Sequence, residues 1–340
     1  MAGLKGLVVV GASAGGVEAL RTFAAGLPAD LQAAVCVVLH VPRSGISTLP
    51  HILGRSGPLP AAHAEAGRAL VAGRIYVAPP NFHVLVDDER LRLSRGPAES
   101  GHRPAADPLF RSAARAWGSS VVGVVLSGSR DDGAFGLATI ARHGGLALVQ
   151  DPEEALYRSM PLQAMELVPA ARAVPCRQMG LVLGGLVAGM VGPVPVAAVD
   201  DARVDAQDAM ATMENRTAGA AGGIPAGLAC PDCHGALFEL PGEHAPRFRC
   251  RVGHAWTSAA LLDEQGEAQE SALWMALHGL EEKAALSRRM AESARFRGSL
   301  STAVRYAEVS EDAEAAGRVI RKLIEQFGDL DDKTRVADAP

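Results

Sequence analysis

The feature that most constrains this chain is a strand, a tight glycine turn and a helix, all near its start. A run of apolar and β-branched residues, Leu7 to Val10, stops at the turn G-A-S-A-G-G. A helical pattern of apolar residues then begins at Val17. This order places Ser13 at the carboxyl end of a buried parallel strand and beside the N-terminus of a helix. The segment is therefore typical of a G-x-S-x-G turn that presents a serine hydroxyl as a nucleophile.

A phosphate- or dinucleotide-binding turn is the competing interpretation of the same glycines. The usual fingerprint of that turn is G-x-G-x-x-G, with an acidic residue about 20 positions further on. Here Ser13 takes the place of the middle glycine, and no acidic residue follows a second strand at that distance. The residues favour a nucleophile over a nucleotide-binding loop.

Composition narrows the class of protein. With 340 residues the chain is long enough for two domains, and its formal net charge of -5 gives no sign of nucleic-acid binding. No apolar run has the length of a membrane span, and no signal-peptide pattern precedes the first strand. Its five cysteines are too few and too unevenly placed for a disulfide framework. We therefore expect a cytoplasmic protein that binds no nucleic acid and inserts into no membrane.

Two further apolar strands end in polar side chains that are suited to join Ser13. One strand ends at His40, and another leads into S-G-S-R-D-D-G, which contains Asp131 and Asp132. Strands that alternate with amphipathic helices predict an α/β fold with a doubly wound, mainly parallel sheet, whose strand ends share one edge. A serine, a histidine and an aspartate at that edge predict a hydrolytic triad, in an order that differs from that of α/β-hydrolases. The spacing leaves open which aspartate takes part.

The region between the second and third of these strands departs from the alternation. Residues 60 to 95 contain R-I-Y-V-A-P-P, H-V-L-V-D-D and L-R-L-S-R, which predict antiparallel strands and hairpins rather than strand–helix units. Asp107 then predicts the N-cap of a helix whose first residue is Pro108. His102 and Arg103 precede that helix, where they either bind an anionic or amide group of a substrate or lie in a solvated loop.

Several segments, in this order, resemble the catalytic domain of chemotaxis protein-glutamate methylesterases, the CheB family. They are VVVGASAGGVEAL, the strand ending LHVP, GRIYVAPPNFHVLV, GHRPAADPLFRSAA and VVLSGSRDDGAFGL, within about residues 4 to 174. The resemblance implies that Ser13 is the nucleophile, His40 the base and Asp132, rather than Asp131, the orienting acid. It also implies hydrolysis of glutamyl methyl esters on chemoreceptors, often with deamidation of glutamines, and no cofactor for catalysis.

This chain departs from the family pattern in three ways. Family members often carry threonine after the nucleophile and methionine three residues before the aspartate, where this chain has Ala14 and Ser129. If the backbone N–H groups of these two residues hold the oxyanion, the side-chain changes are tolerable and can shift substrate preference. Well-known members also begin with a phosphoacceptor receiver domain, whereas this chain starts directly at the catalytic strand. We therefore expect the receiver switch to be missing.

A second informative stretch contains residues that bind metals in other proteins. Cys230 and Cys233 form C-x-x-C, and Cys250 and His254 form C-x-x-x-H beyond two segments, A-L-F-E-L and P-R-F-R-C, that predict a hairpin. Three thiolates and one imidazole complete the tetrahedral shell of a structural zinc site. A redox C-x-x-C and unligated cysteines are the alternatives. His234 is a rival fourth ligand, but its position next to Cys233 makes its geometry poor.

These segments divide the chain into four parts. We predict a catalytic domain over residues 1–191, a linker over 192–227 with a short helix near 206–213, a zinc-binding module over 228–257 and a helical hairpin over 258–330. Apolar side chains form one stripe on each long helix, which predicts that the stripes pack together; a partner-binding coiled coil is the alternative. The predicted stripe residues are Leu273, Leu277, Leu280, Ala284 and Ala291 on the first helix and Val309, Ala313, Ala316, Ile320, Leu323 and Phe327 on the second. This C-terminal half resembles an extension found on some CheB-like proteins without a receiver.

The leading hypothesis is a serine hydrolase that demethylates chemoreceptor-like proteins, with a C-terminal part that docks a signalling partner or regulates hydrolysis. One alternative is a catalytically weak or silent adaptor that keeps the fold. Another is a hydrolase of a different esterified protein outside chemotaxis. The intact triad residues favour an enzyme, and a neighbouring receptor methyltransferase gene would favour the chemoreceptor as substrate.

Overall fold

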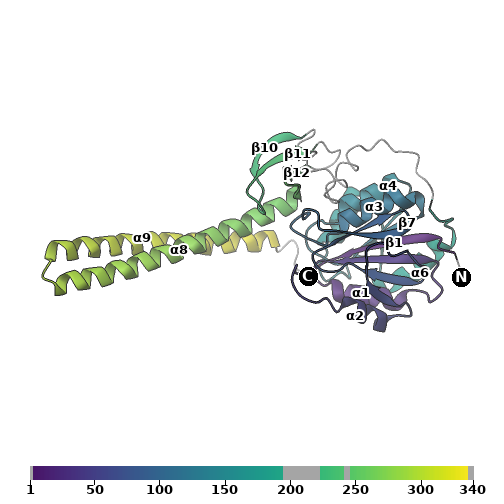
Figure 1. Ribbon diagram of the computed structural model, residues 1–340, viewed down its shortest axis with the longest axis horizontal. Coiled ribbons are helices and arrows are strands. Elements are labelled where there is room, and N and C mark those ends of the chain that lie inside the picture. The colour runs from purple at the N-terminus through teal and green to yellow at the C-terminus, as the bar shows by residue number, and fades with distance from the viewer. Residues whose placement is uncertain (1–2, 194–222, 241–245, 336–340) are drawn as a thin grey trace. The chain divides into compact units, whose positions relative to one another are not determined.

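The computed structural model describes residues 3–193, 223–240 and 246–335 (Figure 1). These residues form two compact units, one that extends to Leu261 and one that begins at Leu262. The predicted linker lies mostly outside the described residues, as does the whole of the short helix predicted near 206–213. The predicted domain boundaries therefore remain predictions.

A seven-stranded sheet forms the centre of the first unit, with all its paired strands parallel in the order β3-β4-β2-β1-β7-β8-β9. The strands are β1 (Gly6–Ala12), β2 (Ala33–Leu39), β3 (Ala61–His63), β4 (Arg74–Val77), β7 (Val121–Val125), β8 (Leu146–Gln150) and β9 (Arg172–Val174). The strand order reverses beside β1, and ligands of such sheets bind outside the strand ends at that point. The predicted class, a doubly wound and mainly parallel α/β sheet, is confirmed.

Helices cover both faces of this sheet (Figure 1). They are α1 (Gly16–Gly26), α2 (Leu49–Ser56), α3 (Ala106–Trp117), α4 (Ala134–Arg142), α5 (Ser159–Leu167) and α6 (Cys176–Ala188), with a 3-10 turn at Gly118–Ser120. Val9 shares a core with α3, α4 and α5, whereas Val8 shares the opposite core with α1, α2 and α6. Adjacent residues serve opposite faces because side chains alternate along a strand. With both faces covered, β1 is buried throughout.

The region between residues 60 and 95 differs in part from its prediction. β4 joins the central sheet and pairs in parallel with both β2 and β3. Within this region β5 (His83–Asp87) and β6 (Arg90–Ser94) form the antiparallel hairpin, with Asp88 at the turn in a left-handed conformation (φ 51°). The prediction of antiparallel strands is wrong for β3 and β4, because a short apolar pattern does not encode the direction of a strand.

The start of α3 also differs from its prediction. The helix begins at Ala106, so Asp107 lies in its first turn rather than at the N-cap. The Asp107 carboxylate instead accepts hydrogen bonds from the backbone N–H groups of Gly133 (3.1 Å) and Gly136 (2.7 Å), at the start of α4. Asp107 therefore satisfies unpaired N–H groups of a neighbouring helix, a long-range contact that its local sequence does not reveal.

A small antiparallel sheet completes the first unit. Its strands are β10 (Ile224–Ala229), β11 (Ala236–Leu240), β12 (Arg247–Cys250) and β13 (Ala255–Thr257), paired in that order. β11 and β12 are the predicted hairpin, and Leu237 and Trp256 are buried in a small core beside the cysteines. We refer to the described residues between 224 and 257 as the Cys3His module.

The second unit is a pair of long helices, which confirms the predicted helical hairpin. The helices are α8 (Ser258–Phe296), whose residues up to Leu261 belong to the first unit, and α9 (Leu300–Arg335). Arg288 bonds Glu314 and Arg321 bonds Glu281, so the two helices run antiparallel. Among the described residues, no helix of either unit has the length and apolar character needed to cross a bilayer.

The buried stripe of this hairpin agrees with its prediction on α8 and is shifted on α9. Leu277 and Ala284 are buried on α8, as predicted. On α9, Ala313 is buried as predicted, but Ile324 is buried in place of Leu323, which is 37% exposed. Adjacent apolar residues allow either to face the partner helix, and pattern alone does not decide between them.

A close backbone approach between α1 and α6 leads to a stability prediction. A Cβ on Gly180 would lie 1.8 Å from the carbonyl oxygen of Gly26, whereas a Cβ on Gly185, also in α6, would have no atom within 4 Å. We expect Gly180→Ala to lower the free energy of unfolding by about 1–3 kcal/mol, because α6 must move away from α1. Gly185→Ala should raise it by about 0.5–1 kcal/mol, because alanine favours a helix. Denaturant titration compares the variants, and a loss of equal size in both would contradict this packing.

Candidate active site and metal site

Ser13, His40 and Asp132 meet at the carboxyl edge of the central sheet, where β1, β2 and the loop after β7 bring them together. Nδ1 of His40 lies 3.1 Å from Oγ of Ser13, and Nε2 lies 2.7 Å from Oδ2 of Asp132. The side chains of His40 and Asp132 are only 6% and 3% exposed, so little water competes for these bonds. With Nδ1 accepting from Ser13, the ring carries its hydrogen on Nε2, toward Asp132. A base placed between a hydroxyl and a carboxylate can activate the serine.

The turn that carries Ser13 is held by the loop after β7. The Ser13 N–H donates to the carbonyl of Ser127 (3.0 Å), and the Ser127 hydroxyl donates to the carbonyl of Ala14 (2.9 Å). Gly15 has a φ of 67°, and a Cβ there would lie 2.8 Å from Oγ of Ser127. Glycine is therefore required at this position both by the backbone conformation and by the lack of space.

Asp132 is anchored by the first turn of α3. Its Oδ2 accepts the backbone N–H of Ala106 (2.6 Å), and its Oδ1 accepts the N–H of Asp107 (3.1 Å). These N–H groups have no partner within their own helix, and the helix dipole favours a negative charge there. Burial alone would raise the pKa of Asp132, but the hydrogen bond and charge of His40 and the two N–H groups outweigh burial and lower it. Asp132 is therefore an ionised carboxylate.

Two carboxyl groups beside Asp132 are shifted in the opposite direction. Burial, and then the charge of Asp132, raises the pKa of Asp107. Burial also raises the pKa of Asp131 to about 6, although the Thr257 hydroxyl donates a hydrogen bond to its Oδ1 (2.9 Å). Asp131 thus bonds to the Cys3His module, whereas Asp132 bonds to His40.

His102 and Arg103, for which the sequence left open substrate binding or a solvated loop, lie in different surroundings. The ring of His102 stacks on that of His40, with centroids 3.7 Å apart and planes at 14°. Burial, and then the charge of His40, lowers the pKa of His102 to about 3, so this ring is neutral at neutral pH. Arg103 donates to Oδ1 of Asn81 and to two backbone carbonyls, including that of Gly96 (2.7 Å). His102 therefore packs directly against His40, while Arg103 holds its own loop together.

Ala14 and Ser129, the predicted backbone donors to an oxyanion, each adjoin a residue at the Ser13 turn. Ala14 is the neighbour of Ser13 in the chain, and Ser129 follows Gly128, where a Cβ would lie 2.9 Å from Cβ of Ser13. The backbone of Gly128 is fixed, because its N–H donates to the carbonyl of Tyr157 (3.0 Å). The backbone at Gly128 thus lies beside the Ser13 side chain.

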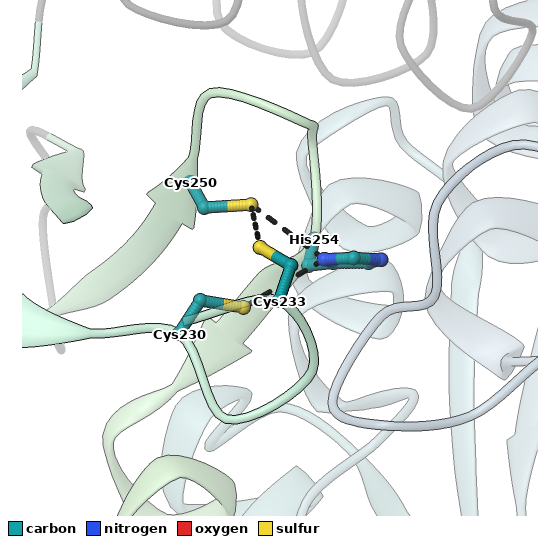
Figure 2. A group of neighbouring side chains, drawn as sticks. All are labelled: Cys230, Cys233, Cys250 and His254. Carbon is teal, nitrogen blue, oxygen red and sulfur yellow. Dashed lines mark hydrogen bonds between the residues drawn. The ribbon is translucent and has the colours of Figure 1, made fainter. Parts of the chain in front are cut away.

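The four predicted metal ligands, Cys230, Cys233, Cys250 and His254, converge in the Cys3His module (Figure 2). The Sγ atoms of Cys233 and Cys250 are 3.6 Å apart, and Nδ1 of His254 lies 3.7 Å from Sγ of Cys230 and 3.6 Å from Sγ of Cys250. The corners of a tetrahedron around zinc are about 3.5–3.8 Å apart, given Zn–S of about 2.3 Å and Zn–N of about 2.0–2.1 Å. The group can therefore hold a metal ion, and within the described residues His234 is not part of it.

Contacts around this cluster orient its ligands. The indole N–H of Trp256 donates to Sγ of Cys230 (3.4 Å). Nε2 of His254, the nitrogen that faces away from the sulfurs, lies 3.9 Å from Oδ2 of Asp232. Donors to a thiolate and acceptors beside a ligating imidazole are the usual outer partners of a metal site.

Comparison with known proteins finds a match between residues 8–183 and the CheB methylesterase family model. Over 178 residues, 51% of each chain, the sequence is 39% identical to protein-glutamate methylesterase/protein-glutamine glutaminase 2 of Caulobacter vibrioides. A protein-glutamate methylesterase/protein-glutamine glutaminase of Symbiobacterium thermophilum is 38% identical over 170 residues, which are 50% of this chain and 47% of that protein. A putative one of Leptospira interrogans is 36% identical over 160 residues, which are 47% of this chain and 83% of that protein.

A solved structure agrees with these sequence matches. The crystal structure of the Thermotoga maritima CheB methylesterase catalytic domain superposes with a TM-score of 0.52 at 27% identity, over 54% of this chain and 98% of that one. The chain spans about half the length of the Caulobacter and Symbiobacterium relatives. The family match ends before the Cys3His module begins.

The buried carboxyl of Asp131 leads to a prediction for stability against pH. Folding raises the pKa of this carboxyl from 3.8 to about 6, because burial disfavours its charged form. Its contribution to the free energy of unfolding is therefore fully present below pH 3.8 and is lost as the pH rises through about 6. Asp131→Asn removes the buried charge and keeps an oxygen for Thr257. We expect it to raise the free energy of unfolding by about 1–3 kcal/mol at pH 8, and far less near pH 4. Denaturant titration at the two pH values measures this, and an equal gain at both would contradict the assigned cause.

Proposed function

Because the chain belongs to the CheB methylesterase family, we propose that it is a serine hydrolase that removes glutamyl methyl esters from a chemoreceptor-like protein and deamidates glutamines there. The observation that carries this proposal is the continuous contact from Ser13 through His40 to Asp132. The names of the Caulobacter and Symbiobacterium relatives, which include both activities, support both reactions. Esters and primary amides react through similar tetrahedral transition states, so one triad can serve both.

In the proposed mechanism, Nδ1 of His40 takes the hydroxyl proton of Ser13 as the oxygen attacks the ester carbonyl. Asp132 keeps the hydrogen of the ring on Nε2 and stabilises the imidazolium that forms. His40 then returns the proton to the leaving oxygen, which departs as methanol, or to nitrogen, which departs as ammonia from an amide. A water molecule, deprotonated by the same imidazole, then hydrolyses the acyl-serine.

Three further residues have proposed roles in this mechanism. The backbone N–H groups of Ala14 and Ser129 are the proposed donors to the oxyanion, each worth roughly 3 kcal/mol in the transition state. His102 is assigned to the support of His40, since a neutral ring lying flat on the imidazole stabilises a cation without adding charge.

The substrate and location belong to the same proposal. Family membership supports a methylated chemoreceptor as the substrate, and we propose a cytoplasmic location for the enzyme. The signalling partner predicted for α8 and α9 stays a prediction.

Loss of the nucleophile tests the proposed reaction. We expect Ser13→Ala to lower methanol release from carboxyl-methylated chemoreceptors by about a thousand-fold or more, because the members of a triad act as a unit. His40→Gln should cost nearly as much. Ser56→Ala, which removes a hydroxyl that bonds within α2, should keep the wild-type rate.

Two outcomes would redirect the assignment. Wild-type methanol release by Ser13→Ala would exclude Ser13 as the nucleophile. A folded wild-type protein that releases no methanol from any methylated receptor would favour the adaptor or a hydrolase of another protein.

For the metal site, we propose a structural Zn²⁺ held by Cys230, Cys233, Cys250 and His254. Three thiolates and one imidazole suit zinc and close its shell, which leaves no position for a substrate. The metal would stabilise the small module by holding its two ligand-bearing turns together. The triad chemistry does not require it as a cofactor.

Substitution of a ligand tests the zinc proposal. We expect the purified protein to contain about one zinc per chain and Cys230→Ser to lose it, because three remaining ligands bind far more weakly. Hydrogen exchange should then increase in the Cys3His module while β1 stays protected. Cys176→Ser, a cysteine whose thiol bonds the carbonyl of Ala19, should keep its zinc. Full zinc content and unchanged exchange in Cys230→Ser would rule out the proposed ligand set.

A further inference from the structure

The Cys3His module lies against the segment that leads into α3. Two backbone hydrogen bonds join them, from the N–H of Ser100 to the carbonyl of Ala255 (2.7 Å) and from the N–H of Ala255 to the carbonyl of Ala98 (3.2 Å). Ala255, Trp256 and Thr257 are each 2% exposed or less. The module is therefore bound to the catalytic part through a water-excluding contact.

One side chain of the module bonds directly to the turn that carries Asp132, and a second reaches that turn through Asp107. The hydroxyl of Thr257 donates to Oδ1 of Asp131 at 2.9 Å. The guanidinium of Arg247 lies 3.6 Å from Oδ2 of Asp107, whose Oδ1 accepts the N–H of Gly133. Since Asp131 and Gly133 are the residues on either side of Asp132, the module holds the turn from both sides.

Arg247 occupies a buried, charged environment rather than the rim of the contact. Its guanidinium lies 3.7 Å from Oε2 of Glu99 and 4.5 Å from the centroid of the Phe135 ring. Glu99 also accepts two hydrogen bonds from Arg111, at 3.0 and 2.6 Å. An arginine so placed compensates buried carboxylates beside the triad, and its removal would leave their negative charge poorly balanced.

The hairpin formed by β12 and β13 carries both of these contacts and two of the four predicted metal ligands. Arg247 and Thr257 are paired across β12 and β13, at the end of the hairpin away from its turn. Cys250 ends β12, and His254 directly precedes β13. A metal ion at the cluster would therefore fix the hairpin that presents Arg247 and Thr257 to the catalytic part.

We propose that Arg247 and Thr257 are positioning residues for the acid of the triad, so that the Cys3His module is required for the full rate of hydrolysis. The inference rests on the proposed esterase function. Loss of either contact lets the turn at residues 131–133 relax, which weakens the bond between Asp132 and His40. The substrate-facing groups at Ser13 stay unchanged, so the effect falls on kcat rather than on KM.

Paired substitutions test the two contacts. Thr257→Val removes the hydroxyl and keeps the shape, whereas Thr257→Ser keeps the hydroxyl. Arg247→Met removes the charge and keeps an apolar chain beside Phe135, whereas Arg247→Lys keeps the charge. We expect the valine and methionine variants to lower kcat for methanol release about 10–100-fold at unchanged KM, and the serine and lysine variants to recover much of it. Ser258→Ala, which loses a hydroxyl bond from the first residue of α8 to the carbonyl of Pro246, is the matched control and should keep the wild-type kcat.

A second readout needs no substrate. The proton between Nε2 of His40 and Asp132 should give a low-field NMR resonance, which we expect to shift or broaden in Thr257→Val and Arg247→Met but not in Ser258→Ala. If the wild-type protein releases no methanol, the esterase proposal fails while this resonance still tests the positioning role. If Arg247→Met unfolds the module, the two Thr257 variants decide alone. Wild-type kcat and an unshifted resonance in Thr257→Val would overturn the inference.

Discussion

A carboxylate buried away from water must be surrounded by hydrogen-bond donors, and the arrangement of this candidate active site follows from how Asp132 meets that requirement. Its donors besides His40 are the first backbone N–H groups of α3. The helix therefore has to begin directly beside β1. Gly11 makes this approach possible, since a Cβ there would lie 2.7 Å from Cβ of Ala106. A small residue in the central strand thus determines where Asp132, the acid of the proposed triad, can be held.

Asp107 extends this constraint to a second helix. Its N–H donates to Asp132, and its carboxylate accepts the N–H groups of Gly133 and Gly136 at the start of α4. One residue thereby links the starts of two helices around the same turn. Such a link transmits small movements, because a buried carboxyl with several partners cannot shift without leaving one of them unsatisfied. This explains how contacts on Asp107 from Arg247 can bear on a bond that His40 makes.

Much of the fold could be predicted because short-range patterns in the sequence determine it. The alternation of buried strands and amphipathic helices predicted the parallel sheet and the edge shared by Ser13 and His40. The C-x-x-C and C-x-x-x-H spacings likewise predicted the Cys3His cluster, since local turns set the distances between the ligands within each pair. The choice between Asp131 and Asp132 needed the family resemblance, because two adjacent residues lie at nearly the same distance from the end of the strand.

The remaining features depend on contacts between distant segments. The direction of β4, the capping of α4 by Asp107 and the stack of His102 on His40 arise from packing, which no local pattern encodes. Arg247 and Thr257 were missed for the same reason, since in the sequence they are ordinary strand residues. The sequence offered one signal, which is that Arg247 is a charged residue in a strand that also carries the metal ligand candidate Cys250. Such a residue could have suggested a buried carboxylate as its partner.

The pairing of Arg247 with Thr257 also has a consequence for the order in which the protein is synthesised. A ribosome produces Ser13, His40 and Asp132 well before it produces the hairpin that steadies them. The nascent chain therefore passes through a stage in which every reacting group exists but the turn that holds the acid still lacks its last two partners. Under the proposed positioning role, the full rate of hydrolysis is reached only late in translation. A prematurely released chain that lacks this hairpin would then be a slow esterase.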